Sequence, residues 1–440
     1  MIRTLAKNTR NEILWSTFVQ YAGKIINIAL GIISVKILTN AIGLNEYGVY
    51  GQIAEYALFF SVVANLGIFG NTVRKMSEAP QDGKLFINSL FLRIITAGGF
   101  FLAGTLYAWL FIPERAFLIG TLFFMASLLA DYVTSICNGM LQANYLMGRA
   151  VTASIIGRIT NLGIILFLAK LGQSSAIFFF LAPLGASIIT AGLSLIFVRL
   201  HIRFTWQLDW PLLKMLFLTA LPFGIINILN NLYYRFLPSF AAAKILTDAQ
   251  FGSYTISLHI ATTVSLLSTY LMYSVLPAFK RALRDGKFTS AYEIFHKIKI
   301  GLIALSILTV AIGSWAAPFA ISLVSSKEYF LPELWFILPL MLVLASVSYF
   351  YDLVLITLFA LEKDLWFLKR ELAALLLGTA ILTCAFLPII LPETFPTNTP
   401  TQTALILTSA ILAEALIVWL GLRKIKIELV TTPHPPSSST

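Results

Sequence analysis

The sequence has little charge for its length. Only 12% of its 440 residues are Asp, Glu, Lys or Arg, whereas 58% are hydrophobic. A soluble chain of this size needs far more charge to cover its surface, so the composition indicates a polytopic membrane protein. Two cysteines and four histidines are scattered without the spacing of a disulfide framework or a metal site. We therefore expect no metal and no catalytic residues.

The apolar residues form twelve runs that are long enough to cross a bilayer. A helix needs about 20 mostly apolar residues to span ~30 Å of hydrocarbon. The predicted spans are residues 14–38, 50–73, 86–111, 116–141, 150–170, 175–198, 216–243, 252–278, 300–324, 332–360, 367–391 and 403–422. The first is too long for the apolar core of a signal peptide, so we expect it to be retained. The spans leave no room for a soluble catalytic domain.

Lysine and arginine are distributed unevenly between the predicted loops. The side that holds the N-terminus carries 22 of them, the opposite side carries 5, and the other four lie inside spans. Because basic residues stay on the cytoplasmic side, both termini are predicted to be cytoplasmic. This bias also explains the net charge of +11, so no nucleic-acid partner is expected.

Two stretches about 200 residues apart are nearly the same. Residues 36–50 read "KILTNAIGLNEYGVY" and residues 244–254 read "KILTDAQFGSY". A second match involves Asp131 and Asp352, each of which precedes an arginine by eighteen residues. A lysine and an aromatic–glycine pair can mark any helix end at a membrane interface, but that does not explain both matches in the same order. The matches equate span 1 with span 7, span 2 with span 8, and span 4 with span 10, which predicts a repeat.

Six spans separate the copies, and an even number preserves orientation, so the repeats are parallel. We therefore predict an all-α polytopic membrane protein, with about 12 transmembrane helices in two six-helix lobes around a central cavity. The N-terminal lobe covers residues 1–210 and the C-terminal lobe covers residues 211–425. Residues 426–440, which end in "PHPPSSST", are predicted to be a disordered cytoplasmic tail.

The segment "KILTNAIGLNEYGVYGQIAEYALFF" resembles the first loop of Wzx-type O-antigen and polysaccharide flippases. These belong to the multidrug/oligosaccharidyl-lipid/polysaccharide (MOP) exporter superfamily. The likeness covers the whole chain, through the span count, the six-plus-six repeat, the RK pair after span 2 and "LQANYLMGR" after span 4. It implies a transporter, not an enzyme, that moves undecaprenyl-pyrophosphate-linked oligosaccharide from the cytoplasmic to the periplasmic leaflet by alternating access.

The resemblance also implies a setting for the protein. We expect a multi-pass protein of the bacterial cytoplasmic (inner) membrane that serves O-antigen, lipopolysaccharide or other surface polysaccharide biosynthesis. Its partners would be the lipid-linked oligosaccharide, the bilayer and the polysaccharide polymerase machinery. No cofactor is expected beyond a coupling proton or sodium ion.

Polar stripes run along three predicted spans, and each stripe contains a cation. An ionisable residue at mid-membrane costs at least about 2.5 kcal/mol, and it usually faces protein or a wet cavity. The candidate substrate-binding residues are Lys24 and Asn27 in span 1, Arg158 and Asn161 in span 5, and Asn231 and Arg235 in span 7. The cations would hold the pyrophosphate and the amides would meet sugar hydroxyls. The alternatives for the cations are structural pairing or snorkelling, and for Arg93 we favour snorkelling or loop anchoring.

Four acids also fall inside spans, and they are candidates for coupling or gating. Glu55 lies close to the start of span 2, so it can also be interfacial. Asp131 and Asp352 occupy matching positions, where capping or pairing with a nearby arginine at the cytoplasmic gate is the favoured role and coupling to a proton or sodium ion the alternative. Glu414 has no partner that the sequence identifies. Pro222 lies in the same span as Arg235, so a bend there would connect gate motion to the site.

Two other functions stay open. A small-molecule or multidrug exporter of the same superfamily that handles cations would favour an acidic cavity, which three cationic stripes oppose. An integral-membrane glycan polymerase or ligase needs catalytic groups on a large external loop. The longest such loop, 391–402, has one acid and no Lys, Arg or His, so the enzyme is the least favoured.

Overall fold

The structure is a computed structural model that describes residues 2–286, 288–361, 369–370, 373, 376 and 399–431. All regular elements in these ranges are helices, as the sequence predicted. The elements of the first half are α1 (Ile2–Asn65), α2 (Ile68–Glu78), α3 (Gly83–Phe111), α4 (Arg115–Ala143), α5 (Met147–Lys170), α6 (Ala176–Phe179) and α7 (Leu181–Arg199).

The second half begins with α8 (Trp210–Asn231), which continues through the π-helical turn η1 (Leu232–Phe236) into α9 (Leu237–Ile245). The remaining elements are α10 (Asp248–Arg284), α11 (Phe288–Trp315), α12 (Ala317–Val324), η2 (Lys327–Tyr329), η3 (Pro332–Leu334), α13 (Ile337–Ala360), α15 (Thr399–Lys426) and η4 (Ile427–Thr431).

The helices group into two units according to their internal contacts. Unit 1 comprises Met1–Ile228 with Val324–Ser326, and unit 2 comprises Leu229–Leu323 with Lys327–Thr440. This division falls inside α8, so most of that helix packs with unit 1. The division at residue 210 that the sequence suggested stays a prediction.

Eight helices in the described ranges are long and apolar enough to cross a membrane. A ninth is added if the bent pair Trp210–Pro222 and Gly224–Ile245 is one span. They coincide with predicted spans 1 and 2 together, and with spans 3, 4, 5, 6, 7, 9, 10 and 12. Helix α10 coincides with predicted span 8, while span 11 lies almost wholly outside the described residues. The polytopic class is therefore confirmed.

Helix α1 contains two spans rather than one. Its apolar stretch Ala22–Asn65 has 44 residues, about twice what a bilayer requires. The helix breaks at Gly43, whose φ of 75° and ψ of 177° are unfavourable for a residue with a side chain. The sequence predicted a loop over residues 39–49. The backbone in this region is instead helical on both sides of Gly43, which is the single non-helical residue. The two arms of α1 therefore meet at Gly43.

The repeat is visible in the packing of each unit. Tyr47 and Tyr50 stack at 5.9 Å and 15° just after the first break, and Phe251 and Tyr254 stack at 5.3 Å and 19° at the start of α10. Tyr47, Phe251 and Tyr254 are almost completely buried. The two similar stretches, residues 36–50 and 244–254, thus place the same stacked aromatic pair at the start of a span in both halves.

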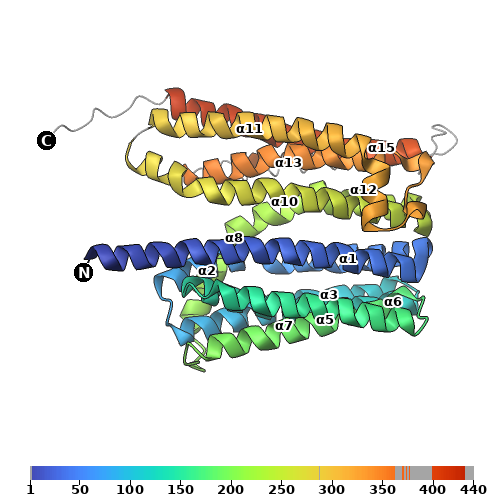
Figure 1. Ribbon diagram of the computed structural model, residues 1–440, viewed down its shortest axis with the longest axis horizontal. Coiled ribbons are helices and arrows are strands. Elements are labelled where there is room, and N and C mark those ends of the chain that lie inside the picture. The colour runs from blue at the N-terminus through green and yellow to red at the C-terminus, as the bar shows by residue number, and fades with distance from the viewer. Residues whose placement is uncertain are drawn as a thin grey trace. The chain divides into compact units, whose positions relative to one another are not determined.

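Each unit is a bundle of packed helices (Figure 1). In unit 1, α4 packs against α3 and α7, while α5 packs against α7 and α1. In unit 2, α13 lies at the centre and packs against α10, α11 and α15. Cys137 is a buried free thiol in the apolar core of unit 1.

Hydrogen bonds and an ion pair hold the linker between α7 and α8 against α3. Asn88 donates to the Gln207 carbonyl at 2.8 Å and accepts from the Asp209 amide at 2.8 Å. Lys84 Nζ lies 2.7 Å from Asp209 Oδ2, and Asp209 Oδ1 caps α8 by accepting from the Leu212 amide. The bonds from Lys84 and then from the Leu212 amide hold the pKa of Asp209 below its usual value. The linker is therefore part of unit 1.

Candidate functional site

The polar stripes of predicted spans 1 and 5 meet in unit 1. Asn27 Nδ2 on the first arm of α1 donates to Ser154 Oγ on α5 at 3.0 Å. Both residues lie sixteen positions before the end of their helical segment, at Gly43 and Lys170, which is about 24 Å at 1.5 Å per residue. Ser154 is only seven residues, about 10 Å, from the start of α5, so the bond lies inside the span but nearer its predicted cytoplasmic end.

The two cations of these stripes lie one turn from that hydrogen bond. Lys24 precedes Asn27 by three residues and is half-buried, and Arg158 follows Ser154 by four residues and is exposed. Asn161 comes three residues after Arg158 on the same face of α5. The structure thus places the two stripes side by side, with Lys24 on one side of the Asn27–Ser154 bond along the helix axes and Arg158 and Asn161 on the other.

Two carbonyl oxygens in this cluster accept no hydrogen bond from any described residue. They are Asn27 Oδ1 and Asn161 Oδ1, and both atoms are buried. A buried acceptor without a donor costs about 1–3 kcal/mol. A hydroxyl group or water that donates a hydrogen bond to either oxygen would therefore remove this free-energy cost.

Asp131 on α4 belongs to the same region. Its carboxyl group interacts with the Ser187 hydroxyl on α7 and with the charge of Arg158. The sequence analysis paired this acid with a nearby arginine at the cytoplasmic gate, whereas the arginine in reach is the candidate substrate-binding cation of α5.

The predicted residues of span 7 lie at a change of helix type. Arg235 is in the π-helical turn η1, and Asn231 is the last residue of α8. Single π-helical turns inside helices are frequent at functional sites. The Arg235 guanidinium lies 5.7 Å from the Phe236 ring, and both Asn231 and Arg235 are half-buried.

Glu414 has partners that the sequence did not reveal. It is only 1% exposed, and Ser348 Oγ on α13 donates to its Oε1 at 2.9 Å. The Tyr234 hydroxyl interacts with Ser348 and Ser265 and lies in the field of Glu414 and Arg235. A buried polar network in unit 2 therefore joins α15 and α13 to the π-helical turn.

Asp352 makes a different contact from its counterpart Asp131. Ser268 on α10 donates to Asp352 Oδ2 at 2.7 Å. Ser268 follows Ser61 by 207 positions, within the offset of the repeat, but Ser61 bonds the Tyr132 hydroxyl at 2.8 Å. Both halves thus have a serine at the matching position. In the second half it bonds Asp352, whereas in the first half it bonds Tyr132, the residue after the matching Asp131. Equivalent positions in the repeat therefore do not make equivalent contacts.

Glu55 is 4% exposed and lies inside unit 1, on the second arm of α1. Burial against other helices is compatible with any depth in the membrane, so the interfacial interpretation of Glu55 stays a prediction. Ser187, Ser265, Ser268, Ser348 and Tyr234 were missed. One signal was available for Ser348, since it precedes Asp352 by four residues and so shares its helical face.

Arg93 does not snorkel, because its side chain is 2% exposed. Its Nη1 donates to the Asn65 carbonyl at 2.8 Å, and its guanidinium lies 4.0 Å from the Tyr132 ring centroid. Asn65 is the last residue of α1, where the backbone acceptors have no helical donors. Arg93 thus anchors the end of α1, which confirms the anchoring half of the expectation.

The break that Arg93 stabilises is also a point of close helix contact. Leu66 and Gly67 separate α1 from α2 and have φ values of 42° and 69°. A Cβ atom on Gly224 of α8 would lie 2.2 Å from the Leu66 carbonyl carbon, and one on Gly67 would lie 2.5 Å from the Ala220 oxygen. Pro222 lies between these contacts in α8. Two irregular helix segments therefore touch backbone to backbone.

Within the described residues, no three His, Cys, Asp or Glu side chains are grouped so that they could hold a metal ion.

The arrangement of helices is that of the MOP superfamily transporters. The chain is similar to a multidrug resistance MATE family transporter of that superfamily in an inward-facing conformation, with TM-score 0.70, 12% identity, and coverage of 94% of this chain and 99% of the other. It is similar to a eukaryotic MATE transporter, AtDTX14, with TM-score 0.65, 12% identity, and coverage of 96% and 99%. It is also similar to a MOP superfamily transporter from Pyrococcus furiosus, with TM-score 0.63, 13% identity, and coverage of 94% and 95%. These likenesses establish the fold.

The family follows from the sequence itself. Residues 13–283, more than half of the chain, match the family model described as "Polysaccharide biosynthesis protein". The chain therefore belongs to this polysaccharide biosynthesis family. Among curated proteins, no significant match is found.

Proposed function

We propose that the protein is a flippase for undecaprenyl-pyrophosphate-linked oligosaccharide units of O-antigen or another surface polysaccharide. It would move them from the cytoplasmic to the periplasmic leaflet of a bacterial inner membrane by alternating access, with both termini in the cytoplasm. The proposal is supported by membership in a polysaccharide biosynthesis family, by the MOP transporter fold, and by the cations within the membrane-spanning segments.

One observation carries the choice of substrate. The hydrogen bond between Asn27 and Ser154 aligns two stripes, so that Lys24 and Arg158 lie near buried amide oxygens that lack donors in the described residues. Cations bind phosphate oxygens through charge-assisted hydrogen bonds. Amide oxygens accept from hydroxyl groups, which sugars supply in number. A ligand with phosphate next to sugar satisfies both kinds of group at once.

Asp131 suggests how a proton could take part. While it is ionised, its carboxylate competes with a phosphate for Arg158. Protonation removes this competitor, so binding of a proton and of the anionic ligand would favour each other. Sodium remains the alternative coupling ion, and Glu55, Asp352 and Glu414 remain candidate coupling or gating acids beside Asp131.

A drug exporter of the same fold is the second candidate. It is favoured by the solved multidrug transporters whose fold this chain shares. For the Pyrococcus furiosus transporter, reverse polarity of the binding pocket suggests a different function. By the same reasoning, pocket charge is the property that best separates the two candidates here.

The experiment measures surface polysaccharide in a strain that lacks its own flippase of matching specificity. Charge reversal by Lys24→Glu, Arg158→Glu or Arg235→Glu should abolish export at normal membrane abundance. Lys24→Arg should retain much of the export, because the site needs a positive charge at this position and does not depend on the donor geometry of the side chain. Lys170→Glu is the matched control, since Lys170 is an exposed lysine at the end of α5.

Normal export by all three abundant reversal variants would refute the cationic site. The same strains, tested for growth on toxic organic cations, address the second candidate. If wild-type protein raises resistance and fails to restore polysaccharide, the protein is a drug exporter.

A further inference from the structure

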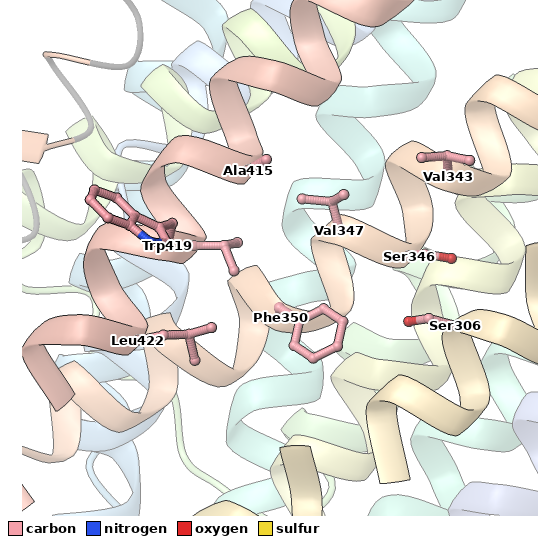
Figure 2. A pocket seen from close by; sticks show the side chains of 9 residues that line it. Ser306, Val343, Ser346, Val347, Phe350, Ala415, Trp419 and Leu422 are labelled. Carbon is pink, nitrogen blue, oxygen red and sulfur yellow. The ribbon is translucent and has the colours of Figure 1, made fainter. Parts of the chain in front are cut away.

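A groove of about 290 Å³ runs along the surface of unit 2 between α11, α13 and α15. Figure 2 shows Val347 and Phe350 of α13 in the middle, with Trp419 and Leu422 of α15 on one side and Ser306 of α11 on the other. The walls are almost entirely apolar. The Ser346 hydroxyl, also at the groove, donates to the Leu342 carbonyl, whereas the buried Ser306 hydroxyl has no hydrogen-bond partner among the described residues.

The walls of the groove carry large apolar side chains that are exposed among the described residues. Helix α11, which forms one wall, is an apolar membrane span that has exposed isoleucines at positions 300, 303, 307 and 312. Helix α15, which forms the other wall, exposes Trp419. Large apolar side chains exposed on a membrane span lie against lipid, so lipid chains are the molecules that reach this groove.

One end of the groove is basic. Helix α15 ends with Arg423, Lys424 and Lys426, and the Arg423 guanidinium lies 5.8 Å from the ring of Trp419, which lines the groove. Lys424 is paired with Glu428 at 2.8 Å, whereas Arg423 is exposed. Helix α11 packs against η4, which follows α15, so the ends of both walls lie together.

The charge decides which lipid fits. Lipid tails are as apolar as the groove, so the groove alone gains little from binding any one chain. A basic residue near the membrane surface attracts an anionic headgroup by about 1 kcal/mol, which is roughly a five-fold preference. A lipid whose headgroup has a net negative charge, with no ammonium group beside its phosphate, can use the groove and Arg423 together.

We propose that this groove binds one acyl chain of an anionic phospholipid, with the headgroup phosphate against Arg423. The groove shares no residue with the candidate substrate-binding set, since Asn231 and Arg235, the members of that set in unit 2, do not line it. The bound lipid would belong to the cytoplasmic leaflet, given the predicted position of the end of α15. The inference itself depends only on binding and not on the flippase function.

The test is native mass spectrometry of the full-length protein in detergent with phosphatidylglycerol or phosphatidylcholine of identical chains. Wild-type protein should retain phosphatidylglycerol roughly five-fold better, for the reason just given. Arg423→Glu should abolish this preference. Ala415→Trp should fill the groove and reduce retention of both lipids. Arg199→Glu, which changes an exposed basic residue at the end of α7, should behave as wild type.

Equal retention of both lipids by wild type, or an unchanged preference in Arg423→Glu, would overturn the proposal. Displacement of phosphatidylglycerol from wild type by equimolar undecaprenyl phosphate would also overturn it, since the groove would then belong to the prenyl chain. A monodisperse gel-filtration peak for each variant shows that lost binding is not lost folding. Failure of polysaccharide export would leave this result unchanged, so the two proposals are tested separately.

Discussion

The contact between Gly224 and the end of α1 predicts that Gly224→Ala destabilises the protein. The new Cβ would lie 2.2 Å from the carbonyl carbon and 2.5 Å from the carbonyl oxygen of Leu66. These are backbone atoms, so the helices must separate by about 1–1.5 Å to restore ordinary contact. Overpacking of this kind costs about 1–3 kcal/mol, and we expect the upper end because the neighbour is backbone. The higher helix propensity of alanine offsets about 1 kcal/mol of this cost, so the free energy of unfolding should fall by about 2 kcal/mol.

The assay is the loss of monodisperse protein on heating in detergent, followed by fluorescence-detected gel filtration. Gly224→Ala should lower the apparent Tm, and Gly70→Ala is the matched control. A Cβ at Gly70 of α2 meets nothing within 4 Å, so this control should leave the Tm unchanged or raise it. Gly224→Ala that is as stable as wild type would refute the close contact between α8 and the break after α1.

Three further predictions concern polar contacts. Arg93→Leu should lower the Tm more than Arg93→Lys, because leucine loses a charge-assisted bond worth about 1.5–3 kcal/mol; equal Tm values would contradict this. Ser348→Ala should cost about 1–3 kcal/mol of unfolding free energy by removing a donor from buried Glu414, and an unchanged chemical-denaturation midpoint would refute it. The lowered pKa of Asp209 contributes stability that is present above pH ~4 and lost as pH falls through the folded-state pKa. The Tm of Asp209→Asn should therefore fall less steeply on acidification than that of wild type, and parallel pH profiles would disprove the role of this pair.

The spans and the repeat could be read from the sequence because both depend on local composition. Apolar runs of about 20 residues identify membrane helices without any knowledge of packing. The aromatic pairs Tyr47–Tyr50 and Phe251–Tyr254 keep the same spacing in both copies, and so they keep the same stacking. The break at Gly43 was not predicted, since nothing in a helix-compatible stretch distinguishes a one-residue break from a loop.

The partners of the intramembrane charges could not be read in the same way. The position of Arg93 near a span end favoured snorkelling, but the carbonyl that it binds is made available by a helix break 28 residues earlier. The partner of Glu414 lies 66 residues away on α13. Helical periodicity tells which side chains share a face of one helix, whereas these contacts depend on which faces of different helices meet.

The contacts between α3 and the linker before α8 have a consequence for the order in which the protein folds during synthesis. Asn88, Lys84 and the main chain at residues 207–209 are all available once the ribosome has released residue 209. The contacts that hold the start of α8 can therefore form before most of the second half has been translated. Domains generally fold as units, the N-terminal one first. Helix α8 would then enter the membrane from a start point that the first half has already fixed.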